Sequence, residues 1–112
     1  MALEVAEEFA SNGKGSIEVI DLRTLVPLDK DAIYASVRKT NRVLILHEDN
    51  LTAGFGAEIA ALVTEFAFES LDAPVMRLAS FDSPVPFAPN LEKMVLPSKQ
   101  QLSKALTQLL KF

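Results

Sequence analysis

The sequence predicts an α/β domain in which helices cover both faces of a mostly parallel sheet, giving three layers, α/β/α. Segments with helical spacing alternate along the chain with short apolar or β-branched segments, and this alternation is typical of such sheets. Residues 42–46 (RVLIL) are apolar after the first position, as expected for a strand buried on both faces. The 112 residues fit a single domain covering the whole chain.

Four segments have the apolar spacing or the capping residues of helices. The second is expected over residues 30–40 with Asp29 as its N-cap, and the third, which has the strongest pattern, over residues 56–71. Ser98 and Gln101 have the spacing of a capping box before the last helix. The residues expected to face inward are Leu3, Ala6, Phe9 and Ala10, then Ile33 and Val37, then Ile59, Leu62, Val63 and Phe66, and finally Leu102, Leu106 and Leu109.

Three segments are expected to be strands: residues 16–21, 42–46 and 74–79. Residues 47–55 are expected to form a loop, and residues 80–97, which contain four prolines, a crossing loop with one short helical turn near residues 91–94. A sheet this narrow leaves much of its edge unpaired. We therefore expect that the sheet lacks N-terminal strands.

Composition and charge argue against several classes of function. The chain has no cysteine, which excludes disulfides, thiolate metal sites and a cysteine nucleophile. Its net charge is −4 and no basic block is present, so a nucleic-acid partner is not expected. No apolar run approaches the roughly 18 residues of a membrane span, and the acidic N-terminus does not resemble a signal peptide. A cytoplasmic location is expected.

Acidic residues follow each predicted strand, at the edge of the sheet where ligands usually bind. Asp21, Glu48, Asp49 and Asp82 could hold a divalent cation, which would make the chain a stand-alone metal-dependent enzyme. Alternatively they cap and solvate loops, which is common for Asp. His47, the only histidine, lacks a recognisable nucleophile or orienting partner, so a structural or interface role is the expected one.

Gly54 and Gly56 lie between a predicted strand and a predicted helix, where a phosphate-binding loop could occur. The third glycine of the dinucleotide fingerprint would fall at position 59, which is an isoleucine. Close packing or a positive φ is therefore the better explanation for these glycines.

Three phenylalanines are the candidate interface residues. Phe81 and Phe87 lie in the proline-rich loop, and Phe112 is the last residue; aromatic side chains often contribute much of the binding energy at interfaces. The alternatives are packing within the chain and a free-standing binding module in which the loop is a polyproline-like ligand.

Three long stretches resemble beta subunits of 2-oxo acid dehydrogenase decarboxylases: IEVIDLRTLVPLDKDAI (17–33), HEDNLTAGFGAEIAALV (47–63) and LDAPVMRLASFDSPVPFAPNLEKMVLP (71–97). They cover nearly the whole chain in the family's order, and DLRTLVPLD and the D-x-P-x-P-F motif are specific. The His47–Glu48 pair favours the branched-chain 2-oxo acid type over the pyruvate type.

The resemblance implies a transketolase C-terminal-type domain, cut from a longer beta subunit, with a five-stranded mixed sheet. In that sheet one strand that this chain lacks would lie between residues 17–21 and 42–47. Thiamine diphosphate and Mg²⁺ would bind elsewhere in the parent enzyme, which decarboxylates 2-oxo acids and acylates lipoyl groups. This domain would carry no catalytic, cofactor or metal residue.

The same resemblance implies the partners and the location. The domain would help to assemble the alpha subunit and a second beta subunit, and would dock the subunit-binding domain of the dihydrolipoyl acyltransferase. In a eukaryote the location would be the mitochondrial matrix.

Overall fold

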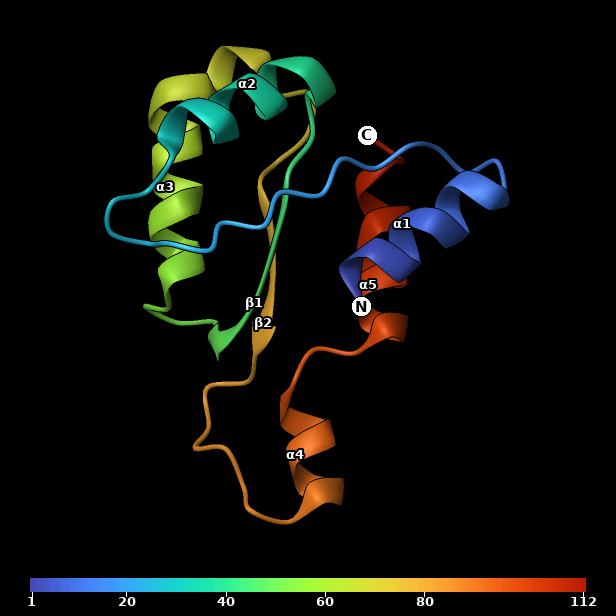
Figure 1. The fold of residues 1–112 in the computed structure, drawn as a ribbon, viewed down its shortest axis with the longest axis vertical. Coiled ribbons are helices and arrows are strands. Elements are labelled where there is room, and N and C mark those ends of the chain that lie inside the picture. Colours follow the sequence, from blue (N-terminus) through green and yellow to red (C-terminus); the bar gives the residue numbers. More distant parts are fainter.

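The computed structural model describes all 112 residues, and Figure 1 shows their arrangement. Two parallel strands form the sheet, and helices lie on both sides of it. The elements in chain order are α1 (Ala2–Ser11), α2 (Lys30–Thr40), β1 (Leu44–Asn50), α3 (Phe55–Ala67), the short 3-10 helix η1 (Phe68–Ser70), β2 (Met76–Ser80), α4 (Pro89–Val95) and α5 (Lys99–Leu109).

The three expected layers are present around β1 and β2. Leu44 pairs with Met76 and Leu46 with Leu78, and the register is irregular between Leu46 and Asn50. Helices α2 and α3 lie on one side of the strands, and α1 and α5 on the other (Figure 1). The α/β class with a parallel sheet is therefore confirmed.

Each face of the sheet has its own hydrophobic core. The larger core joins α2, β1 and α3 through Ile33, Val37, Ile45, Ile59, Val63 and Ala67. The smaller one joins α1 to α5 through Val5, Phe9 and Leu102, with Leu44 and Leu46 of β1 packed against it. Side chains of β1 thus alternate between two cores, which explains why residues 43–46 are continuously apolar.

The predicted helix caps are confirmed. Asp29 accepts a hydrogen bond from the backbone nitrogen of Ala32 at 3.0 Å. Ser98 accepts one from the backbone nitrogen of Gln101 at 3.2 Å, and the Gln101 side chain accepts one from the Ser98 nitrogen at 2.9 Å. Both helices therefore begin where their sequences place Asp or Ser.

The strand expected at residues 16–21 is not formed. These residues are extended but make no backbone–backbone hydrogen bond. Ile17 packs against the α1–α5 core and Leu22 against the α2–α3 core, so the segment passes from one face of the sheet to the other. A β-branched run becomes a strand only where a neighbour supplies hydrogen bonds, and here no strand lies alongside it.

Three further expectations were wrong in detail. β1 continues to Asn50, which pairs with Ser80, where a loop from His47 onward was expected. Helix α1 buries Val5 and Phe9, while Leu3 is 66% exposed, because the i, i+4 pair faces α5. Phe66 is 55% exposed; its ring centroid lies 5.8 Å from that of Tyr34.

Candidate functional site

The loops at the C-terminal ends of β1 and β2 are joined by polar contacts of Arg77, Ser80 and Asp82. The hydroxyl of Ser80 donates to the backbone oxygen of Glu48 at 2.6 Å. Arg77 Nη1 donates to the backbone oxygen of Leu51 at 2.7 Å. The backbone oxygen of Ser80 accepts a hydrogen bond from the backbone nitrogen of Leu51 at 3.1 Å. These bonds fix the turn after β1 against the end of β2.

Asp82, in the loop after β2, also binds the turn after β1. Its carboxylate accepts hydrogen bonds from the Thr52 backbone nitrogen at 2.8 Å and from the Thr52 hydroxyl at 2.5 Å. These bonds from Thr52 hold the pKa of the Asp82 carboxyl below its ordinary value. Asp82 is therefore a loop anchor, as the cap-and-loop interpretation of the acidic residues expects.

The acidic residues do not gather into a metal site. Asp21 pairs with Arg23 at 3.4 Å on the exposed surface, and Asp49 accepts a hydrogen bond from the Asn50 nitrogen at 2.8 Å. No group of three or more His, Asp or Glu residues in the chain is placed to hold a metal ion. The structure therefore gives no support to a stand-alone metal-dependent enzyme built on these residues.

The His47 imidazole packs against the glycine turn. Both of its ring nitrogens are buried without a hydrogen-bond partner. A Cβ atom at Gly56 would overlap His47 Nε2, and one at Gly54 would overlap the backbone oxygen of Asn50. Neither glycine has a positive φ. Close packing, rather than phosphate binding or a special backbone conformation, thus accounts for both glycines.

The three candidate interface phenylalanines are all exposed, but they form two separate sites. Phe81 and Phe87 belong to the loop between β2 and α4, and the Phe87 ring is fully exposed. Phe112 follows α5, and Figure 1 places the C-terminus far from α4 and its loop. An exposed aromatic side chain has no role in the core, so these residues remain available for contacts with another molecule.

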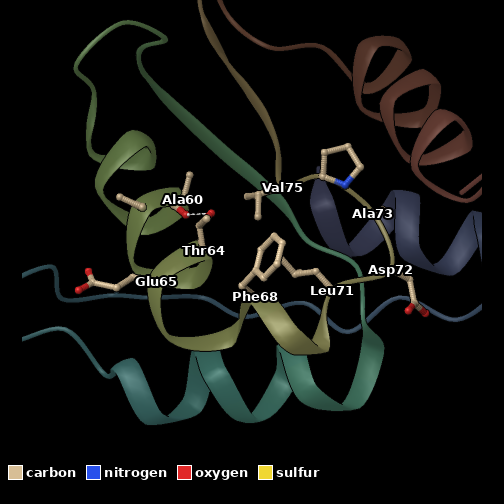
Figure 2. Close-up of a pocket in the computed structure, with 10 residues that line it drawn as sticks. Ala60, Thr64, Glu65, Phe68, Leu71, Asp72, Ala73 and Val75 are labelled. Carbon is tan, nitrogen blue, oxygen red and sulfur yellow. Dashed lines mark hydrogen bonds between the residues drawn. The ribbon is translucent and has the colours of Figure 1, made fainter.

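One surface feature could not be found from the sequence: an open groove of about 840 Å³ beside the outer face of α3. It is lined by residues of α3, by Phe68 of η1 and by the link to β2 (Figure 2). The small residues Ala61 and Thr64, which lie outside the predicted apolar stripe of this helix, were the available signal, because small residues on an outer helix face leave space. These residues alone do not show which segment of the chain forms the other wall of the groove.

No helix in the structure is both long enough and apolar enough to cross a membrane.

Comparison with known proteins places the chain in a family. The model of the family described as "Transketolase, C-terminal domain" matches residues 1–102. The pyruvate dehydrogenase E1 component subunit beta of Rickettsia felis is 47% identical over 95% of this chain and 32% of that protein.

Two other relatives have different names. The acetoin:2,6-dichlorophenolindophenol oxidoreductase subunit beta of Bacillus subtilis is 42% identical over 97% of this chain and 32% of its own length. The mitochondrial 2-oxoisovalerate dehydrogenase subunit beta 2 of Arabidopsis thaliana is 46% identical over 87% of this chain and 26% of its own length. The chain thus spans a third or less of the length of the curated relatives it matches.

Proposed function

Because this chain belongs to the transketolase C-terminal domain family, we propose that it is the assembly and docking domain of a thiamine-diphosphate-dependent 2-oxo acid dehydrogenase decarboxylase. One observation carries the proposal: the chain is 47% identical, over 95% of its length, to a subunit named as the beta subunit of a pyruvate dehydrogenase E1 component. The parent enzyme would oxidatively decarboxylate a 2-oxo acid and acylate lipoyl groups.

The substrate class is part of this proposal. Relatives named for pyruvate and for 2-oxoisovalerate match at 47% and 46% identity, so overall identity does not separate the two. The His47–Glu48 pair is the reason to place the branched-chain substrate first. In the structure His47 packs beneath the glycine turn, which is a packing role and not a substrate contact.

Catalysis would take place outside this domain. The carboxylates that could have held Mg²⁺ do not come together, and the only histidine has both nitrogens buried against the chain itself. The residues present therefore do not fit a thiamine diphosphate–Mg²⁺ site. We assign that site to the rest of the parent enzyme, and to this chain the contacts that hold the assembly together.

The exposed phenylalanines are the contacts we assign to partners. Phe81 and Phe87, on the loop beyond the sheet, would face the alpha subunit or the second beta subunit. Phe112, at the end of α5, would dock the subunit-binding domain of the dihydrolipoyl acyltransferase. Buried aromatic anchors dominate the energy of such interfaces, and truncating one commonly weakens binding by about tenfold or more.

Binding of the isolated subunit-binding domain at low salt tests the docking role. We expect the intact chain to bind it in calorimetry and deletion of Phe112 to weaken binding by about tenfold. Val26→Ser is the matched control, because Val26 is 90% exposed and lies far from both candidate sites in sequence. Failure of the intact chain to bind would overturn the docking role.

The size of the native gene product tests the parent enzyme. Mass spectrometry of the protein from its source should find a chain about three times longer, in keeping with relatives of which this chain covers 32%. We place the complex in the cytoplasm, or in the mitochondrial matrix of a eukaryote; the plant relatives are named as mitochondrial proteins.

A further inference from the structure

Helix α1 ends at an asparagine that is followed by a glycine. Asn12 is the C-cap residue, and Gly13, with φ of 65°, takes the left-handed conformation after it. The backbone nitrogen of Gly13 donates to the oxygen of Ala10 at 3.1 Å, and that of Lys14 donates to the oxygen of Phe9 at 2.9 Å. This pair of hydrogen bonds is the Schellman motif, which closes the last turn of a helix.

The side chain of Asn12 belongs to the same helix end. Its Nδ2 donates a hydrogen bond to the backbone oxygen of Glu8 at 2.8 Å. Asn12 and Gly13 are both exposed, and a Cβ atom at Gly13 would have no neighbour within 4 Å. Water therefore reaches both residues, and only the hydrogen bonds of the helix end hold them in place.

Asparagine is chemically labile, and most so before glycine. The backbone nitrogen of Gly13 can attack Cγ of Asn12; a C–N bond forms, and Nδ2 leaves as ammonia with the proton that the attacking nitrogen loses. Water then opens the cyclic imide at one of its two carbonyls, which gives aspartate or isoaspartate. Glycine favours the attack because it has no Cβ to shield its nitrogen or to restrict the backbone.

No other asparagine in the chain precedes a glycine. The others are Asn41, Asn50 and Asn90, which precede Arg42, Leu51 and Leu91. In each of these pairs the attacking nitrogen would carry a residue with a side chain, which obstructs its approach to the amide. The sequence thus makes Asn12 the position at which this reaction is expected to be fastest.

The folded helix end opposes the reaction. The imide ring needs the Gly13 nitrogen on the same side of the Cα–C bond of Asn12 as the Asn12 Cβ, whereas ψ of 6° at Asn12 holds it beside the backbone nitrogen of Asn12. Rotation about this bond breaks the Schellman motif and separates Nδ2 from Glu8. The helix end must therefore open first, and such ends are the parts of a fold that open most readily.

We propose that Asn12 is a site of spontaneous deamidation, and that the Schellman motif at the end of α1 sets its rate. The reaction needs only water, so it goes beyond the proposed function and is independent of any partner or substrate of the parent enzyme.

The modification would loosen the end of α1. A carboxylate at position 12 cannot donate to Glu8, and it places a negative charge at the negative end of the helix. Isoaspartate also adds Cβ to the backbone path, so the Schellman motif cannot form again in the same register. Phe9, which is 3% exposed in the core between α1 and α5, lies in this last turn. Figure 1 shows α1 beside α5, and the contact between these helices is the one that would weaken.

Peptide mapping by mass spectrometry tests the site on the full chain, incubated at mildly alkaline pH. We expect deamidation at Asn12 with both products, and a rate that rises with pH because the attacking nitrogen must lose its proton. Asn12→Gln is the matched control, because it keeps an amide at the helix end but its longer side chain closes a ring far more slowly. Deamidation that is fastest at another asparagine would overturn the proposal.

A peptide of residues 8–16 tests the role of the helix end. It contains Asn12 and Gly13, but so short a segment does not hold a helix in water. The peptide should react about tenfold faster than the folded chain, because exposed hydrogen bonds of modest strength are all that oppose the reaction. Equal rates in the peptide and the folded chain would show that the Schellman motif does not control the reaction, and that part of the proposal would be wrong.

Asn12→Asp reproduces one product and tests its effect on α1. Amide hydrogen exchange at residues 9–14 should be about fivefold faster than in the parent chain, as expected for the loss of one exposed hydrogen bond. Asn90→Asp adds the same charge at the exposed start of α4 and should leave these amides unchanged. Unchanged exchange in Asn12→Asp would contradict the loosening of α1.

Discussion

The side-chain nitrogen Nδ2 of Asn41 donates a hydrogen bond to the backbone oxygen of Ser70 at 2.7 Å. Asn41 ends α2 in the left-handed conformation, with φ of 62°. Its own backbone oxygen accepts a hydrogen bond from the nitrogen of Asp72 at 2.8 Å. One residue thus ends a helix and fixes the start of the link to β2, which forms one wall of the groove.

Substitution of Asn41 should separate its two roles. Asn41→Gly keeps the left-handed turn and loses the bond to Ser70, so we expect the free energy of unfolding to fall by about 1 kcal/mol. Asn41→Ala also loses the bond but keeps a Cβ at the positive φ, so it should be less stable than Asn41→Gly by about 1 kcal/mol. Urea denaturation measures both. Equal stability of Asn41→Gly and the parent chain would show that the Ser70 bond contributes nothing.

Gly56→Ala should destabilise the fold through His47. The new Cβ would overlap Nε2 of the imidazole and lie 3.2 Å from Cγ2 of Ile45, and the ring has little freedom to move because both nitrogens are buried. Overpacking of this kind lowers the free energy of unfolding by about 1–3 kcal/mol.

A double-mutant cycle shows whether the loss of stability results from the clash with the His47 ring. Adding His47→Ala to Gly56→Ala should recover part of the stability, with a coupling of about 0.5–3 kcal/mol between the two sites. Strictly additive losses would mean that the clash is relieved in another way.

Local signals in the sequence predicted the helices and their ends well. Asp29, Ser98 and Gln101 act on backbone groups within three residues, so no long-range information is needed to place them. The prediction of a strand at residues 16–21 was wrong because strand formation does depend on long-range information. The β-branched residues of this segment fit a strand, but a strand also needs a neighbour, and the spacing of a single segment contains no information about neighbours.

The site was predictable only in part, for the same reason. Asp82 was a candidate metal ligand until the structure placed Thr52, 30 residues earlier, against its carboxylate. Phe81, Phe87 and Phe112 were expected to be available to partners, and all three are exposed; whether they bind partners stays a prediction. The groove was missed because periodicity identifies the inner face of α3 but not the segment beside its outer face.

Lys99 links α5 to α1, and this link should depend on pH. Its Nζ lies 2.8 Å from Glu4 Oε2 and 3.3 Å from Glu8 Oε1. The hydrogen bond to Lys99 lowers the pKa of Glu4, and hydrogen bonds to Glu4 and Glu8 raise the pKa of Lys99. The contribution of Glu4 is therefore complete above the ordinary glutamate pKa and is lost as the pH falls through its lowered pKa.

Lys99→Met tests this link. All three groups are exposed, so we expect only a small fall in Tm at neutral pH, reduced by salt. The difference from the parent chain should disappear in acid, once Glu4 is protonated. Lys104→Met removes the same charge from exposed α5 without breaking an ion pair, and should leave Tm nearly unchanged. A difference that persists in acid would assign the effect to packing of the Lys99 stem instead.

The unpaired segment at residues 16–21 should promote self-association. Its backbone groups have no partner within the chain, Val19 and Ile20 are 37% and 39% exposed, and the two-stranded sheet has open edges. Such segments and edges can pair with another chain, and a lysine opposes pairing because its charge would have to be brought into the contact.

Val19→Lys should therefore lower the concentration-dependent mass seen by light scattering. Val26→Lys is the matched control, because it adds the same charge at a 90% exposed valine outside the segment. If both substitutions lower the mass equally, net charge rather than strand pairing drives association. If the parent chain is monomeric at all concentrations, the prediction that this segment and the open sheet edges promote self-association is wrong.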